Sequence, residues 1–134
     1  MSPRPLVLVA DDDPDILLLM TLTLERDGYD VVAAKDGLGA LEAAVERVPH
    51  LVLLDLMMPG LDGYEVTRRL RLEPATKDLP IVIVTAAAEE SQAARALEAG
   101  ADAYMKKPFS PRELLAKTAA LILERRPRSR LASA

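Results

Sequence analysis

Short apolar runs alternate with longer amphipathic segments along the whole chain. The apolar runs cover residues 6–10, 29–34, 51–54, 81–84 and 103–105. The third and fourth runs are apolar at every position, which is typical of parallel strands buried between two layers of helices. Because a helical pattern follows each run, we expect an α/β fold: a doubly wound, five-stranded parallel sheet with five helices.

The amphipathic segments carry signals for where helices begin and end. The predicted starts are Asp13 before Pro14, Asp62 with Glu65 three residues later, and the capping box of Ser110 and Glu113 around Pro111. Gly28 and Gly100 stand where two helices are expected to stop. One domain is expected over residues 1–126, and residues 127–134 are expected to be a flexible tail or the start of a linker.

Composition narrows the class of protein. The chain has 134 residues, of which 50% are hydrophobic and 28% charged, so a single domain can bury a sizeable core. It has no Cys, which excludes disulfides and thiolate metal sites. No apolar run approaches the roughly 18 residues of a membrane span, and the first residues lack the layout of a signal peptide. We therefore expect a cytoplasmic location and no membrane contact.

The charge of the chain is unevenly distributed. The net charge is −4, but residues 124–134 contain four Arg and one Glu, a net of +3, which leaves −7 on the preceding 123 residues. An acidic body is a poor binder of nucleic acid, so direct nucleic-acid binding by this domain is not expected.

The side chains that could carry out chemistry come directly after the predicted strands. They are Asp11, Asp12 and Asp13 after the first run, Asp55 after the third, Thr85 after the fourth, and Lys106 and Lys107 after the fifth. Parallel sheets bind ligands beyond the carboxyl ends of their strands, where residues distant in sequence meet. Asp13 is expected to do no more than cap a helix.

These residue types together suit phosphoryl transfer. Asp11, Asp12 and Asp55 cannot all ionise at close quarters without a counter-charge, and their oxygens are ligands that Mg²⁺ accepts. An ionised Asp is a competent nucleophile towards phosphorus. Lys107 and Thr85 can contact phosphate oxygens, so positioning and charge neutralisation are both provided.

The chain resembles the receiver domain of bacterial two-component response regulators over residues 5–125. The matching segments are 7–13, 53–63, 84–86 and 106–109, in the same order and spacing. The resemblance implies a flavodoxin-like topology with strand order 2-1-3-4-5. It also implies a phosphorylation target, not an enzyme, that assists its own phosphotransfer and dephosphorylation.

The resemblance also assigns roles to individual residues. It implies that Asp55 is the phosphoacceptor, that Asp12 binds Mg²⁺ directly, and that Asp11 acts through water. The third protein ligand would be the backbone carbonyl of Met57, while the side chains of Met57 and Met58 are expected to pack.

The same resemblance places further groups at the site. Thr85 and Lys107 would hold phosphate oxygens, Tyr104 would be an aromatic switch, and the Lys107–Pro108 peptide bond would be cis. The implied partners are a sensor histidine kinase or phosphotransfer protein, and a downstream effector or an output domain missing from this chain. A monomer or weak dimer is expected.

Three alternatives are open at this point. An aspartyl phosphatase of the haloacid dehalogenase type also uses an Asp after a strand, but it needs a second Asp where Met57 stands. A flavodoxin-like nucleotide carrier would need a first loop rich in Ser, Thr and Gly instead of three Asp. A degenerate receiver that acts only as an interaction scaffold would be expected to lack some of the site residues.

Overall fold

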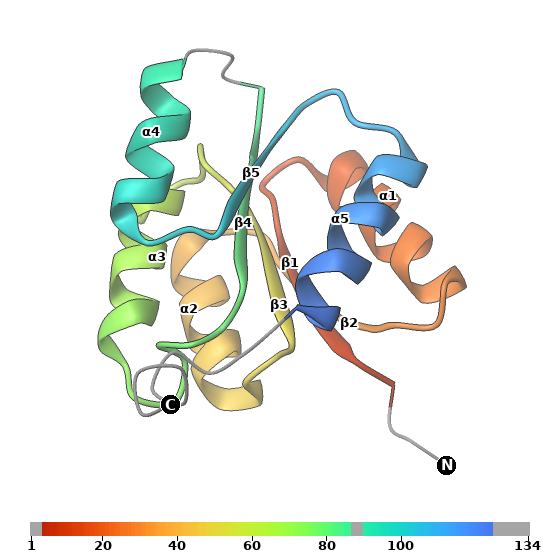
Figure 1. The fold of residues 1–134 in the computed structure, drawn as a ribbon, viewed down its shortest axis with the longest axis horizontal. Coiled ribbons are helices and arrows are strands. Elements are labelled where there is room, and N and C mark those ends of the chain that lie inside the picture. The colour runs from red at the N-terminus through yellow and green to blue at the C-terminus, as the bar shows by residue number, and fades with distance from the viewer. Residues whose placement is uncertain (1–3, 87–89, 125–134) are drawn as a thin grey trace.

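The computed structural model describes residues 4–86 and 90–124, and its strands and helices alternate along the chain (Figure 1). The strands are β1 (Leu6–Ala10), β2 (Asp30–Ala34), β3 (Leu51–Asp55), β4 (Ile81–Thr85) and β5 (Ala103–Lys106). The helices are α1 (Pro14–Arg26), α2 (Gly37–Arg47), α3 (Gly63–Leu72), α4 (Glu90–Ala99) and α5 (Pro111–Leu123). These elements confirm the five strand–helix units that the hydrophobic pattern predicts.

The strands form one parallel sheet in the order β2-β1-β3-β4-β5. Figure 1 shows α2, α3 and α4 on one side of this sheet and α1 and α5 on the other. The expected doubly wound, flavodoxin-like topology is therefore confirmed. The carboxyl ends of β1, β3, β4 and β5 consequently lie along a single edge, because neighbouring strands run in the same direction.

Two apolar cores lie on opposite faces of the sheet, because successive residues of a strand point to opposite sides. Leu8, Leu54 and Ile83 belong to the core beneath α2, α3 and α4. Their neighbours Val9 and Leu53 belong to the core beneath α1 and α5. Burial on both faces explains why the central runs have no polar alternation.

The helix caps follow the sequence signals. The side chains of Asp13, Asp62 and Ser110 accept hydrogen bonds from backbone N–H groups in the first turns of α1, α3 and α5. Glu65 instead pairs through its carboxylate with Arg68 and Arg69, at 3.2 and 3.1 Å. Such exposed pairs contribute little to stability.

Two further expectations concern membrane-spanning helices and the tail at the end of the chain. Among residues 4–86 and 90–124, no helix has the length and apolar character needed to cross a bilayer. The expected tail at 127–134 lies outside the described residues.

Arg71 at the end of α3 ties several elements together at the amino edge of the sheet. Its guanidinium donates to the backbone oxygens of Gly100, Lys77 and Leu79, at 2.9, 3.1 and 2.6 Å. It also pairs with Asp102 at 2.8 Å, with the two side chains only 14% and 28% exposed. Asp102 in turn accepts a hydrogen bond from the N–H of the first residue of β4 at 2.8 Å.

We therefore predict that Arg71→Met lowers the free energy of unfolding by about 2–4 kcal/mol, because several acceptors and one carboxylate lose their donor. Urea denaturation measures this. Arg68→Met is the matched control, and its exposed pair should account for less than about 1 kcal/mol. An equal loss of unfolding free energy in both variants would show that the Arg71 network contributes no more to stability than an exposed ion pair.

Candidate functional site: an acidic cluster at the carboxyl edge

Three carboxylates meet where β1 and β3 end side by side. Asp11 directly follows β1, and Asp55 is the last residue of β3. Asp11 and Asp55 are 1% and 6% exposed, whereas Asp12 faces solvent. One oxygen from each of the three carboxylates lies within 4.8 Å of the others. The structure thus brings together the Asp residues that the sequence places after two different strands.

Asp11 is held in place by hydrogen bonds on both carboxylate oxygens. Oδ1 accepts from the backbone N–H of Asp13 at 2.9 Å, and Oδ2 accepts from Nζ of Lys107 at 2.7 Å. Asp13 itself is exposed and caps α1 through its own side chain, as predicted. The role of Asp11 is therefore distinct from that of its neighbour two residues on.

Lys107 brings the positive charge of the site from the far end of the chain. Its Nζ lies 3.4 Å from Oδ1 of Asp55 as well as next to Asp11. Its backbone N–H donates to the oxygen of Thr85 at 2.9 Å, and the Lys107–Pro108 bond is cis, as the resemblance implies. Burial alone would lower the pKa of Lys107, but its contacts with Asp11 and Asp55 outweigh that effect and raise it.

Asp55 is the carboxylate whose charge is most strongly disfavoured. Burial is the main cause, and the negative charge of Asp11 adds to it, with a smaller effect from Asp12. Lys107 acts in the opposite direction but does not cancel these effects, so the pKa of Asp55 rises to about 6. Three carboxylates and one ammonium leave an excess of negative charge, which a bound cation would neutralise.

The donor set fits a hard metal ion. It consists of carboxylate oxygens, without nitrogen or sulfur ligands, and such oxygens suit cations of the Mg²⁺ type. The acidic cluster could therefore hold a metal ion.

The loop after Asp55 contains a requirement that the sequence analysis missed. A Cβ on Gly63 would lie 2.8 Å from the backbone oxygen of Asp55 and 3.0 Å from Cα of Leu56. Glycine lets α3 begin directly against the end of β3, and its N–H donates to the oxygen of Leu56 at 2.9 Å. No local pattern in the sequence marks this glycine, because the close approach is to the backbone of Asp55 and Leu56.

The two methionines of this loop differ from one another. Met58 is 8% exposed and packs in the core, as expected. Met57 is 69% exposed, so the expectation that its side chain packs is wrong. Met57 lies between the end of β3 and the buried Met58, and it is turned out to solvent.

The remaining predicted residues lie on the neighbouring strands. Thr85 ends β4 with 1% exposure, and Tyr104 on β5 is half-buried opposite Ile83. Burial, and next the nearby Tyr64, raise the pKa of Tyr104. The guanidinium of Arg95 on α4 stacks over the Tyr64 ring at 4.3 Å. This aromatic neighbourhood of Tyr104 was also missed, because Tyr64 and Arg95 are remote from it in sequence.

A family model for the response regulator receiver domain matches residues 7–119. The chain belongs to this family and is a receiver domain of two-component signalling. As such it is a phosphorylation target and not a classical enzyme. Because the chain belongs to the receiver domain family, it is neither a haloacid dehalogenase phosphatase nor a flavodoxin-like nucleotide carrier.

Individual relatives agree with this assignment. The chain is 47% identical over 116 residues to the alkaline phosphatase synthesis transcriptional regulatory protein PhoP of Bacillus subtilis, covering 87% of this chain and 48% of that protein. It is 42% identical over 116 residues to the phosphate regulon transcriptional regulatory protein PhoB of Pseudomonas aeruginosa, covering 87% and 51%. The chain thus spans about half the length of the curated relatives it matches.

Solved structures agree as well. The receiver domain of the Francisella response regulator 1452 is 33% identical with a TM-score of 0.83, covering 90% of this chain and 98% of that one. The BeF3-activated DrrB receiver domain is 30% identical with a TM-score of 0.83, covering 91% and 100%.

The charge balance of the cluster leads to a stability prediction. Because the pKa of Asp55 is higher in the folded than in the unfolded protein, the folded state binds more protons between about pH 4 and 6. The stability present at low pH is therefore lost as the pH rises through this range. Without divalent cations at pH 7, Asp55→Asn should raise the free energy of unfolding by about 2–3 kcal/mol.

This gain should fall to near zero at pH 4, and chemical denaturation at the two pH values measures it. Asp30→Asn is the control, since that exposed carboxylate lies at the opposite edge of the sheet and pairs weakly with Arg4 at 3.6 Å. A pH-independent effect of Asp55→Asn, or a loss of stability at pH 7, would contradict the description of the cluster.

Proposed function

We propose that Asp55 accepts a phosphoryl group from the phosphohistidine of a sensor histidine kinase or phosphotransfer protein. The observation that carries this proposal is the place of the Asp55 carboxylate. It ends a buried central strand, 3.4 Å from the Lys107 ammonium and within the cluster formed with Asp11 and Asp12. The backbone of the nucleophile is fixed, an ammonium lies beside it, and the neighbouring carboxylates can hold a cation that a phosphate requires.

The transfer exchanges one bond to phosphorus for another. A carboxylate oxygen of Asp55 forms a bond to phosphorus, the phosphorus–nitrogen bond to the donor imidazole breaks, and that nitrogen takes up a proton. Lys107 and Thr85 would each hold an oxygen of the transferred group. The product is an acyl phosphate on Asp55, which water later hydrolyses to restore the carboxylate.

The cation of the proposed site is Mg²⁺. Asp12, Asp55 and the backbone carbonyl of Met57 would bind it directly, and Asp11 would bind it through water. When bound, Mg²⁺ neutralises negative charge on the entering phosphoryl group and on the carboxylates. Supporting this choice are the all-oxygen donor set and the excess negative charge that Lys107 leaves unbalanced.

Phosphorylation would be read out through Thr85 and Tyr104. A phosphate on Asp55 would draw the Thr85 hydroxyl towards it, and the Tyr104 ring would move into the space that Thr85 leaves. Tyr104 is half-buried on β5, so such a movement would alter the neighbouring surface.

The receiver domain would act through another protein or an output domain. Residues 1–126 would form the receiver and residues 127–134 a tail or the start of a linker. The relatives of which this chain spans half are transcriptional regulatory proteins, which supports an output domain in the whole protein. We place the protein in the cytoplasm as a monomer or weak dimer, and we assign it no direct nucleic-acid contact through this domain.

Phosphorylation can be tested directly on the protein. Incubation with a small acyl phosphate and Mg²⁺ should add the mass of one phosphoryl group, and the adduct should be lost with hydroxylamine. Asp55→Asn keeps the shape of the side chain but removes the anionic nucleophile, so labelling should vanish. Lys107→Ala leaves the nucleophile in place and should still be labelled. Intact-mass spectrometry reads each result.

Asp30→Asn again serves as the control and should be labelled like the wild type. Circular dichroism establishes that each variant is folded. Full labelling of folded Asp55→Asn would overturn the assignment of the phosphoacceptor. Loss of labelling in Asp30→Asn would show that the assay does not report on this site.

A further inference from the structure

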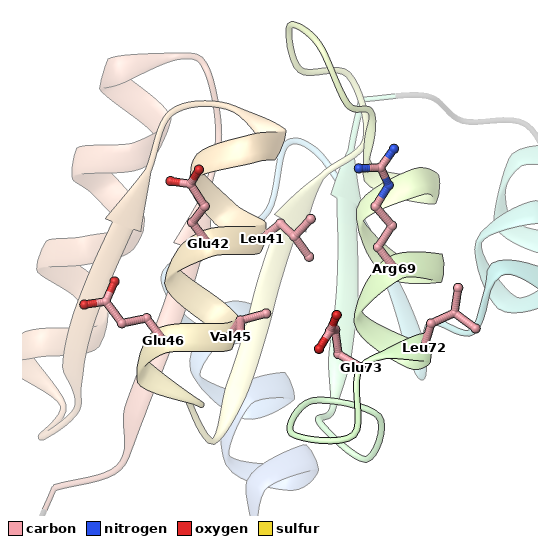
Figure 2. A pocket seen from close by; sticks show the side chains of 7 residues that line it. All are labelled: Leu41, Glu42, Val45, Glu46, Arg69, Leu72 and Glu73. Carbon is pink, nitrogen blue, oxygen red and sulfur yellow. The ribbon is translucent and has the colours of Figure 1, made fainter.

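A groove between α2 and α3 shares no residue with the acidic cluster and has no part in the proposed phosphotransfer. Its volume is about 650 Å³. Figure 2 shows the side chains that line it. The residues that line it are Leu41, Glu42, Val45 and Glu46 of α2, and Arg69, Leu72 and Glu73 at the end of α3. We call it the α2–α3 groove.

The middle of the α2–α3 groove is apolar and open to solvent. Leu72 is 82% exposed and Val45 39% exposed. Figure 2 shows Leu41 and Val45 pointing from α2 towards α3. Exposed aliphatic side chains that cluster between two helices are typical of an interaction surface, whereas single exposed aliphatic residues are common on any protein.

The rims of the α2–α3 groove are acidic. Within the described part of the chain, the carboxylates of Glu42, Glu46 and Glu73 make no hydrogen bond or ion pair. Arg69, the single basic residue of the lining, already pairs with Glu65 at 3.1 Å. The groove therefore offers three uncompensated negative charges around an aliphatic centre.

The architecture restricts how a partner can bind here. The backbone groups of α2 and α3 are used within the helices, and neither wall of the groove is a strand edge, so an added β-strand has nothing to pair with. A helix laid with its apolar side in the groove satisfies both the shape and the hydrophobic centre. The carboxylates lie at the rims instead of converging on one point, which disfavours a small-molecule site.

We propose that the α2–α3 groove binds a basic amphipathic helix of a partner protein. Aliphatic side chains at helical spacing would contact Leu72 and Val45, and flanking Lys or Arg side chains would pair with Glu42, Glu46 and Glu73. The groove lies towards the carboxyl ends of α2 and α3, whereas Asp55 lies beside the amino end of α3. We therefore expect the unphosphorylated chain to bind the helix.

The test uses a fluorescent peptide of about 14 residues, or about 20 Å of helix. Leu lies on one face of the peptide and Lys on the other. The full chain should bind it, and Glu46→Lys should weaken binding about five-fold because attraction becomes repulsion. Leu72→Ser should weaken it by a similar factor. Asp55→Asn should bind like the wild type, so this result stands apart from any failure of the phosphotransfer proposal.

Matched controls lie on the opposite face of the sheet. Glu25→Lys makes the same charge change on α1, and Leu18→Ser removes a leucine of α1 that is 57% exposed. Both controls should bind the peptide like the wild type, and a peptide with Glu in place of Lys should not bind. Equal weakening by control and groove variants would overturn the proposal, as would undiminished binding by the groove variants.

Two other occupants would also overturn it. The chain carries its own basic segment at residues 125–134, with four Arg and Leu131. A ten-fold gain in peptide affinity on deleting these residues would identify the segment as the occupant. Concentration-dependent dimerisation abolished by Leu72→Ser would identify a second copy of the chain.

Discussion

The ion pair between Lys107 and Asp11 is the interaction on which the arrangement of the site depends. It joins residues 96 positions apart at a distance of 2.7 Å, and the same ammonium lies 3.4 Å from Asp55. This geometry requires β1, β3 and β5 to end at the same edge of one parallel sheet. A single lysine cannot balance three carboxylates. The pKa of Asp55 is raised mainly because its carboxylate is buried, and the negative charge of Asp11 adds to this effect. The site can therefore bind one more cation, which would balance the remaining negative charge.

The two edges of the sheet differ in how well their charged groups are compensated. At the carboxyl edge, buried charges are only partly compensated, which costs stability and favours ligands. At the amino edge, Arg71 satisfies three backbone oxygens from two loops and one carboxylate. The α2–α3 groove lies towards that second edge, so a partner bound there leaves the acidic cluster open to a phosphoryl donor.

Much of the fold could be predicted from the sequence, because its signals are local. The uninterrupted apolar runs at 51–54 and 81–84 reflect burial on both faces of the sheet, and the caps at Asp13 and Ser110 reflect hydrogen bonds made within one turn. The meeting of Asp11, Asp55 and Lys107 followed from the rule that parallel strands end together. Strand order is not a local property and came from the resemblance to a family.

The features that escaped prediction are those set by distant packing. Gly63 is needed only because α3 starts against the backbone of Asp55, which no local pattern records. The same holds for the stacking of Arg95 on Tyr64 and for the network around Arg71. The exposure of Met57 depends on the path of a loop, and hydrophobic character alone suggested the opposite.

An NMR titration of the Asp55 carboxyl carbon, with and without Mg²⁺, measures the charge state on which the proposed site depends. We expect a midpoint of about 6 in the absence of divalent cations. That midpoint should fall clearly when Mg²⁺ is added, because the cation stabilises the ionised carboxylate. Asp12→Ala should reduce the response to Mg²⁺. A midpoint near the ordinary value of an aspartate, unchanged by Mg²⁺, would contradict the claim that Asp55 stands in a charge-imbalanced site built to receive a cation and a phosphoryl group.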